Sequence, residues 1–313
     1  MFKPKPLFYK RMEALLGQEV DLFFESCHEP PPMYVRCNTI KISPSVLLKR
    51  LAKLWKVRQL FRRYPEIIKI ESKLESGEIG NTREHCLGYY YVQELSSMMP
   101  VIALDPLPGE RILDLCAAPG SKTTQIAAAM KNIGLIIAND NFIPRIKALH
   151  ANLQRCGVTN AIITREDGRS LCSKLSKLNF KFDKVIVDVQ CSMEGRIRTN
   201  PKLLRTWNPK MIRYLSKHQK TMALAGLSCL REDGVFIYST CTLAPEENEE
   251  VIQFLIDRFP LRIEPITLPV RTRPGLTSWY DKQFDERLQK CCRIYPQDND
   301  TEGFFIAKLR KIG

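Results

Sequence analysis

Apolar and polar positions alternate regularly in residues 91–313, the segment predicted to form the larger domain. Short apolar runs predict strands at residues 111–116, 135–139, 161–164, 184–189 and 235–240. Apolar positions at helical spacing predict helices at residues 122–130, 143–156, 211–230 and 245–258. This alternation is typical of an α/β fold with helices on both faces of a parallel sheet. Segments 262–266 and 303–309 predict an antiparallel pair of strands at the edge of that sheet.

Residues 1–90 show a different pattern, which predicts a small α/β domain of their own. Segments 34–40 and 67–70 are strand-like. Ser43-Pro44 begins a predicted helix whose leucines lie on one face. The polar segment 71–84 is the predicted linker between the two domains.

Composition indicates a soluble protein. Of the 313 residues, 44% are hydrophobic and 26% are charged, which is typical of globular proteins. No apolar run approaches the ~20 residues of a membrane span, and residues 1–6 lack the apolar core of a secretion signal. We therefore expect no membrane association and a monomer in the cytoplasm, or in the nucleus if the source is eukaryotic.

The eleven cysteines include no Cys-x-x-Cys pair, so neither a zinc site nor any other metal site is predicted. In a reducing compartment we expect most of them to be free thiols.

Positive charge is concentrated in two segments of the chain. The formal net charge is +14, from 48 Lys and Arg against 34 Asp and Glu. Segments 30–65 and 195–231 each hold nine basic residues and no acidic residue. A solvated surface normally mixes both signs, so these segments favour a polyanionic partner, and nucleic acid before all others. A general bias toward solubility is the alternative.

A small-residue loop follows the first strand predicted in the larger domain. The residues after Asp114 are Cys116, Ala117, Ala118, Pro119, Gly120, Ser121 and Lys122. They lack the glycines of a dinucleotide site or a P-loop. The free backbone N–H groups at the start of a helix suit a carboxylate or a ribose.

Three acidic residues, Asp140, Asp167 and Asp188, follow later strands of the same predicted sheet. The carboxyl ends of parallel strands form the ligand crevice of such folds, where an acidic side chain accepts hydrogen bonds from ribose hydroxyls. Each acid alone is as easily a helix cap or a surface residue. Together with the loop and with Arg145, they predict a site for S-adenosylmethionine rather than NAD.

Two cysteines, Cys191 and Cys241, also follow predicted strands and are expected to lie in the same crevice. The pattern indicates covalent cysteine chemistry beside a bound cofactor. It does not decide which thiol attacks.

An ordered set of motifs resembles the Fmu/Sun family of RNA cytosine-5 methyltransferases over nearly the whole chain. The matching segments are Arg36–Thr39, Gln93–Ser97, Asp114–Lys122, Asp188 with Cys191-Ser192, Ser239–Thr242, Glu246–Glu249 and Gly303–Phe305. The resemblance implies a Rossmann-like methyltransferase domain preceded by an RRM-like domain. It also implies that Cys241 attacks carbon 6 of cytosine, that Cys191 assists product release and that Asp188 contacts the ring nitrogen.

The chain departs from the family pattern around the first of these cysteines. Gln190 and Met193 stand where the family usually has Pro and Gly, and Gln297 stands where it often has His. Proline fixes the backbone angle φ, and glycine adopts positive φ freely. We therefore expect Cys191 to be displaced, with effects on product release and target choice.

Transfer RNA is the first predicted substrate, because the chain is compact, and ribosomal RNA is the second. A non-catalytic RNA-binding or ribosome-assembly protein with the same fold is an alternative from a different functional class. A DNA methyltransferase is less favoured, because its attacking cysteine normally lies in a Pro-Cys motif that this chain lacks. Residues 1–90 show no pair of exposed aromatic residues of the RRM kind, so RNA binding there is predicted to be mainly electrostatic.

Overall fold

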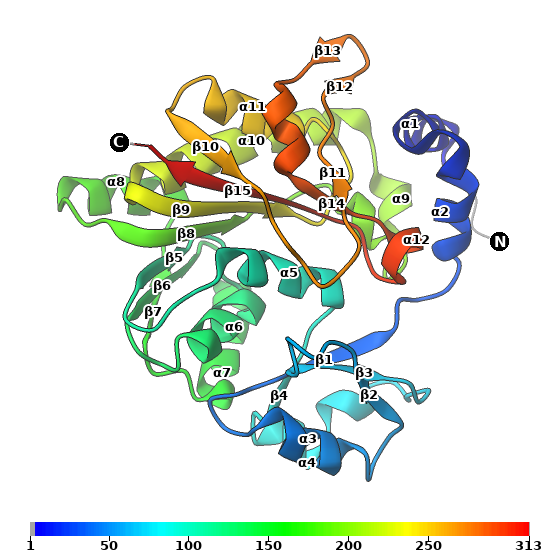
Figure 1. Ribbon diagram of the computed structural model, residues 1–313, viewed down its shortest axis with the longest axis vertical. Helices are drawn as coiled ribbons and strands as arrows, with labels where there is room; N and C mark the ends of the chain where they lie inside the picture. The colour runs from blue at the N-terminus through cyan, green and yellow to red at the C-terminus, as the bar shows by residue number, and fades with distance from the viewer. Residues whose placement is uncertain (1–3, 313) are drawn as a thin grey trace.

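The computed structural model describes residues 4–312 and contains a large sheet with a smaller sheet beside it (Figure 1). Five parallel strands form the core of the large sheet in the order β9-β8-β5-β6-β7. Their bounds are β5 Arg111–Asp114, β6 Leu135–Asp140, β7 Ala161–Arg165, β8 Phe182–Asp188 and β9 Leu230–Thr240. All five coincide with predicted strands to within a few residues.

Helices cover both faces of this sheet, as the pattern predicts. One face carries α5 (Leu95–Leu104), α6 (Ser121–Ala129) and α7 (Ile143–Cys156), and the other carries α8 (Gly168–Lys177), α10 (Pro209–Ser228) and α11 (Glu249–Ile256). The alternation along β8 shows why. Ile186 packs with residues of α5 and α6, whereas Val185 and Val187 pack with residues of α10. Neither α5 nor α8 was predicted.

The C-terminal strands extend the sheet beyond β9. β15 (Phe304–Lys311) pairs antiparallel with β9, and β10 (Leu261–Glu264) and β14 (Cys292–Ile294) both pair with its other side. β11 (Arg273–Pro274) pairs with β14. The predicted antiparallel pairing of the two tail segments is confirmed, but β15 lies inside the sheet rather than at its edge.

The smaller sheet is antiparallel and has the order β2-β3-β1-β4. Its elements are β1 Met33–Cys37, α3 Pro44–Leu51, β2 Val57–Gln59, β3 Ile67–Ile70, η2 Glu78–Gly80, α4 Arg83–Cys86 and β4 Tyr90–Val92. This β-α-β-β-α-β succession is that of ferredoxin-like and RRM-like folds.

The predicted linker at residues 71–84 is wrong. The Trp55 indole donates to the Glu78 carboxylate at 2.6 Å, which fastens this segment to the small sheet. The chain then returns as β4, which pairs with β1 through Val35 and Val92. A polar segment with two short helices resembles a linker in composition, because its contacts use polar side chains.

The first helices lie against the large sheet's side of the molecule, not against the small sheet. They are α1 (Pro6–Leu16) and α2 (Val20–Ser26), joined by η1 (Gly17–Glu19). Phe8 and Phe23 are buried in one cluster with Trp207 and Tyr295. The remaining elements are η3 Glu194–Arg196, α9 Leu203–Thr206, β12 Ser278–Trp279, β13 Lys282–Gln283, η4 Glu286–Lys290 and α12 Pro296–Asn299. Among residues 4–312, no helix combines the length and apolar character needed to cross a membrane.

Candidate active site

A cleft of about 710 Å³ opens at the carboxyl ends of the parallel strands. It lies where the strand order reverses, since β5 has β6 on one side and β8 on the other. Its lining includes all the predicted site residues except Gly120, namely Cys116, Ala117, Ala118, Pro119, Ser121, Lys122, Asp140, Arg145, Asp167, Asp188, Cys191 and Cys241. The sheet thus brings together side chains that lie up to 125 positions apart in the sequence.

The loop between β5 and α6 is held by α7 behind it. Asn152 donates to the Pro119 carbonyl at 2.9 Å, and Arg145 donates to the Ala118 carbonyl. Gly120 has φ 104°, and a Cβ there would lie 3.0 Å from a methyl carbon of Leu149. This glycine is therefore needed for the turn and for close packing against α7, and it does not line the cleft.

The acidic residues of the cleft have different environments. Asp140 is almost fully buried and accepts the Phe142 N–H at 3.1 Å, while its other oxygen lies 3.4 Å from Arg145. Asp167 lines the cleft, but its carboxylate also caps α8 by accepting from Arg169 and Ser170. Asp167 is therefore both a helix cap and a residue of the cleft.

Asp114 lies beneath the loop and belongs to its support. Its carboxyl accepts from the Thr123 hydroxyl at 2.7 Å, and burial raises its pKa to about 7.

Lys122 and Asp188 form an ion pair in the cleft. The Lys122 ammonium lies 2.5 Å from one carboxylate oxygen of Asp188 and donates to Ser97 at 3.2 Å. The other oxygen of Asp188 accepts from the Ser239 hydroxyl at 2.9 Å. The first turn of α6 is thereby connected to the ends of β8 and β9.

The two predicted cysteines lie side by side. The sulfur atoms of Cys191 and Cys241 are 3.3 Å apart, within hydrogen-bonding distance for thiols. Cys191 is buried, whereas Cys241 is partly exposed in the cleft. The hydrogen bond with Cys241 and burial raise the pKa of the Cys191 thiol well above its usual value. Cys191 therefore stays protonated at neutral pH.

The turn that carries Cys191 keeps its shape without the proline and glycine of the family pattern. Met193 adopts the left-handed conformation, with φ 59° and ψ 28°. The Gln190 carbonyl accepts from Gln219 at 3.0 Å, and the Gly195 N–H donates to the Cys241 carbonyl at 3.0 Å. The expected effect of Gln190 and Met193 on the placement of Cys191 stays a prediction. Gln297, the third departure, lies in α12 and is not part of the cleft lining.

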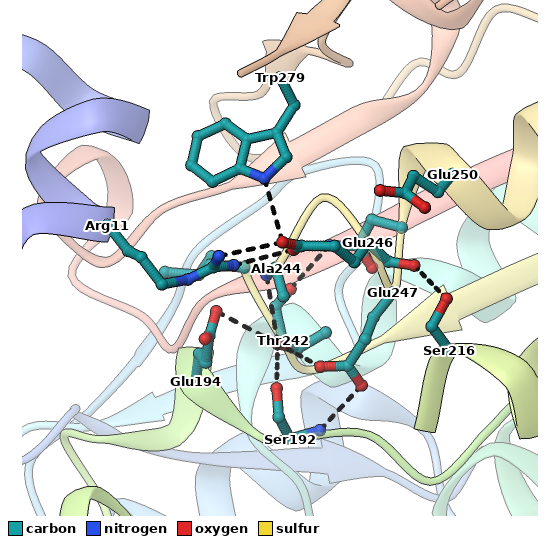
Figure 2. A network of polar contacts seen from close by, with 12 residues as sticks. Arg11, Ser192, Glu194, Ser216, Thr242, Ala244, Glu246, Glu247, Glu250 and Trp279 are labelled. Carbon is teal, nitrogen blue, oxygen red and sulfur yellow. Dashed lines mark hydrogen bonds and ion pairs between the residues drawn. The ribbon is translucent and has the colours of Figure 1, made fainter. Parts of the chain in front are cut away.

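A polar network includes Ser192 and Thr242, the residues that follow the two cysteines (Figure 2). Ser192 donates its N–H to Glu247 at 3.0 Å and shares a 2.7 Å hydrogen bond with Thr242. Burial raises the pKa of Glu247 to about 7. Arg11 of α1 holds the neighbouring Glu246 through two hydrogen bonds of 3.0 and 2.8 Å. The residue after each cysteine is thus fixed by the Glu246–Glu249 motif region.

Two further carboxylates on the cleft wall were not predicted as site residues. Glu94 accepts from the Glu302 N–H at 3.1 Å, and Glu302 accepts from Arg196 at 3.0 Å. All three residues line the cleft. Burial and the neighbouring Glu302 raise the pKa of Glu94. The available signal was position, since Glu94 belongs to one matching motif and Glu302 directly precedes another.

Arg36 of the small sheet reaches the loop that shapes the cleft. Its guanidinium donates to Gln93 at 2.5 Å, to the Ser121 carbonyl at 2.8 Å and to Thr124 at 2.7 Å. Burial lowers its pKa to about 10. This residue therefore connects β1 to the first turn of α6. The charge pattern predicts that Arg36 faces solvent, and the structure shows that it is buried.

Family models match nearly the whole chain. Residues 101–310 match the model described as 16S rRNA methyltransferase RsmB/F. Residues 5–95 match the N-terminal domain of 16S rRNA methyltransferase RsmF.

Curated relatives carry names from the same family. A tRNA (cytosine(49)-C(5))-methyltransferase of Pyrococcus abyssi is 45% identical over 232 residues, which cover 74% of this chain and 73% of the relative. A ribosomal RNA small subunit methyltransferase F of Cronobacter sakazakii is 38% identical over 299 residues, 94% of this chain and 60% of the relative. The chain thus spans about three fifths of the length of that relative.

Solved structures show the same architecture. A methyltransferase homolog from Pyrococcus horikoshii has a TM-score of 0.86 at 35% identity, with 98% of this chain and 95% of that chain covered. NSun6 from Pyrococcus horikoshii with SFG has a TM-score of 0.85 at 25% identity, with 99% and 98% covered. The Rossmann-like methyltransferase fold with an added N-terminal domain is confirmed, and so is the family resemblance. The chain belongs to the RsmB/F (Fmu/Sun) family of S-adenosylmethionine-dependent RNA cytosine-5 methyltransferases.

Proposed function

We propose that this protein methylates carbon 5 of a cytosine in RNA through a covalent bond to Cys241, with tRNA as its first substrate. The observation that carries the mechanism is the pair of thiols 3.3 Å apart in the cleft, with the Lys122–Asp188 ion pair in the same cleft. Carbon 5 of cytosine is a poor nucleophile, and addition of a thiolate to carbon 6 makes it an enamine carbon.

The difference in exposure supports Cys241 as the attacking thiol. A nucleophile must reach the base and must lose its proton first. Cys241 is partly exposed in the cleft, whereas Cys191 is buried with a raised pKa. Cys191 is therefore suited to hold or return a proton.

The proposed sequence of steps uses these residues in order. The Cys241 thiolate forms a bond to carbon 6, while Asp188 hydrogen-bonds the ring nitrogen and stabilises the adduct. S-adenosylmethionine supplies the methyl group that carbon 5 accepts. A base then removes the proton from carbon 5, the bond between carbon 6 and sulfur breaks, and the thiolate of Cys241 is regenerated. We assign to Cys191 a proton relay in this release: it donates its proton to the leaving sulfur of Cys241 and regains a proton from the base that deprotonated carbon 5.

The cleft fits the cofactor that the family uses. Asp140 has an oxygen that lies 3.4 Å from Arg145 and is free to accept from a ribose hydroxyl. The loop 116–122 closes the adjoining wall at the start of α6. We propose that Asp140, Asp167 and Arg145 hold the nucleoside and that the loop holds the amino-acid portion.

The choice of tRNA rests on the relatives. The Pyrococcus abyssi relative, 45% identical, is named for a tRNA cytosine, whereas the Cronobacter sakazakii relative named for ribosomal RNA is 38% identical. Ribosomal RNA is the second candidate. We propose that the protein acts on RNA as a monomer in the cytoplasm.

Transfer of a labelled methyl group to tRNA, ribosomal RNA and DNA tests the proposal. We expect label in 5-methylcytosine of tRNA, with mapping of the modified position in RNA treated with and without the protein. If only ribosomal RNA is labelled, ribosomal RNA is the substrate and tRNA is excluded. Tight RNA binding without any transfer would support the non-catalytic alternative.

A further inference from the structure

One row of side chains on α10 runs from the cleft to the open surface. Residues four positions apart lie on one face of a helix, which places Lys210, Tyr214, His218 and Met222 in a single row. His218 and Met222 line the cleft. Tyr214 and Lys210 lie one and two turns closer to the helix N-terminus, and both are exposed.

Tyr214 is unusual for an aromatic residue, because 74% of its surface is exposed. Aromatic side chains normally bury most of their area. Its position on the helix is about 6 Å from that of His218 along the axis. The ring is therefore close to the cleft without being part of its packed wall.

Basic residues lie near Tyr214 on the helix. Lys210 and Lys217 lie four positions before it and three positions after it, Arg213 directly precedes it in the sequence, and all three are exposed. The ion pairs of segment 195–231 use Arg196, Arg198, Lys220 and Arg231. In the part of the chain that the structure describes, Lys210, Arg213 and Lys217 make no ion pair, so their charges are available to a partner.

We propose that the row Lys210–Tyr214–His218, with Arg213 and Lys217 beside it, binds the single-stranded RNA next to the target cytosine. The inference rests on the proposed function and extends it. A target base must leave its helical stack to reach a nucleophile inside a cleft. Its neighbours then lose a stacking partner, and an exposed aromatic ring with cations around it provides both stacking and phosphate contacts.

In this proposal the RNA contacts two parts of the protein. The small sheet provides mainly positive charge, whereas α10 provides positive charge and the aromatic ring of Tyr214. If this RNA is single-stranded, its affinity should depend on the Tyr214 ring, because a duplex would contact only the basic side chains.

Substitution of the ring tests this directly. We expect Tyr214→Ala to raise the Kd and KM for substrate RNA roughly 5- to 150-fold, the loss of one stacked base. Cofactor affinity should not change. Tyr214→Phe keeps the ring and should stay near wild type. Tyr280→Ala, which removes another exposed aromatic ring outside the cleft lining, is the matched control.

The charges are tested by salt dependence. Each of Lys210→Ala, Arg213→Ala and Lys217→Ala should make the negative slope of log affinity against log salt shallower by about 0.7, the value for one phosphate of a single strand. Lys177→Ala is the control. Lys177 is exposed at the C-terminal end of α8, about 15 Å along that helix from its start at the cleft.

Separate outcomes address the inference and the function on which it rests. If the wild-type protein methylates RNA and Tyr214→Ala binds RNA as well as wild type, the inference is wrong and the function stands. If Tyr214→Phe loses as much affinity as Tyr214→Ala, stacking is wrong. If the wild-type protein binds RNA but transfers no methyl group, the proposed function fails, and the affinities of the variants still decide the role of the row.

Discussion

At the scale of single residues, the cleft contains two thiols whose surroundings differ although both follow strands. Cys191 is buried and within hydrogen-bonding distance of its neighbour, whereas Cys241 is partly exposed. The buried Glu247 carboxylate accepts from Ser192 and Thr242, the residues that follow the two cysteines. The two sulfur atoms are therefore kept close by the fixed backbone around them and not by a disulfide bond.

Replacement of each thiol should separate attack from release. Cys241→Ala is expected to abolish both methyl transfer and any covalent RNA adduct, because burial raises the pKa of the other cleft thiols, Cys116 and Cys191, and so disfavours their thiolates. Cys191→Ala is expected to attack and methylate but to accumulate a denaturant-resistant protein–RNA complex. Gel analysis of both variants after incubation with RNA and cofactor measures this. An adduct that forms in Cys241→Ala and is lost in Cys191→Ala would reverse the assignment.

The backbone at Met193 provides a second residue-scale prediction. A residue with a Cβ atom loses roughly 1–2 kcal/mol of stability in the left-handed region, and glycine avoids this cost. Glycine also makes the unfolded chain more flexible, which cancels part of the stability gained. Met193→Gly is therefore expected to raise the free energy of unfolding by about 0.5–1 kcal/mol, measured by urea denaturation. Met193→Ala keeps the Cβ atom and serves as the control. A glycine variant no more stable than the alanine variant would show that this turn is unstrained.

At the scale of elements, β1 and α6 are joined by one buried guanidinium. Arg36 uses three hydrogen bonds to connect the small sheet, Gln93 and the first turn of α6. Asn38 adds a second connection, since it donates to the carbonyls of Gly88 and Cys156 at 2.8 and 2.7 Å. The motif Arg36–Thr39 therefore acts at the junction of the two sheets.

Loss of this guanidinium should affect both stability and cofactor binding. Arg36→Met leaves buried acceptors without donors, which is expected to lower the free energy of unfolding by about 2–4 kcal/mol. Cofactor affinity should fall as well, because the start of α6 loses its support. Thermal denaturation and calorimetric titration with S-adenosylmethionine measure the two effects.

Arg58→Met is the matched control on the same sheet. Arg58 is exposed and forms a surface ion pair of 2.9 Å with Glu71, and such pairs contribute about 0–1 kcal/mol. If the two variants are equally stable and bind the cofactor equally well, Arg36 has no coupling role.

At the scale of the whole molecule, two regions that are far apart in the sequence combine exposed basic residues with a sequence free of acidic ones. The small sheet presents Lys49, Lys53, Arg62 and Arg63, and the segment from α9 to α10 presents Lys202, Arg205, Lys210, Arg213 and Lys217. Arg36 and Arg198 are buried and do not contribute to either region. We infer that RNA contacts both regions.

RNA affinity should then fall steeply with salt. Each phosphate neutralised contributes a slope of about −0.7 to −0.9 in log affinity against log salt. Replacement of Lys49, Lys53, Arg62 and Arg63 should make this slope less negative, and additional replacement of the five α9–α10 residues should make it less negative still. Binding titrations at several salt concentrations measure this. A salt-independent affinity in the wild-type protein would exclude the two regions as an RNA footprint.

The five parallel strands of the large sheet and the helices α6, α7, α10 and α11 could be predicted from the sequence, whereas α5 and α8 could not. Apolar runs such as Val185–Val187 are long enough to show a buried strand, and helices such as α7 have a clear apolar face. The same order implied that Asp140, Asp167, Asp188, Cys191 and Cys241 would meet, because parallel strands end at one edge of a sheet. Local pattern and a general rule of topology sufficed for these residues.

Other features depended on contacts between distant segments. β4 pairs with β1 across more than fifty residues, which excludes a linker at 71–84. α1 and α2 bury Phe8 and Phe23 against Trp207 and Tyr295, a choice of partner that amphipathic periodicity does not contain.

Within the site, the sequence placed the thiols in one crevice, but only the folded chain determined their difference. Burial, the hydrogen bond between the sulfur atoms and the network around Glu247 are properties of packing. Arg36 is a second example, because its charge alone predicts a surface residue. Only the folded chain brings the carbonyl of Ser121 and the side chains of Gln93 and Thr124 to its guanidinium. Residue type and periodicity determine which elements form, whereas the environment of each side chain depends on which elements meet.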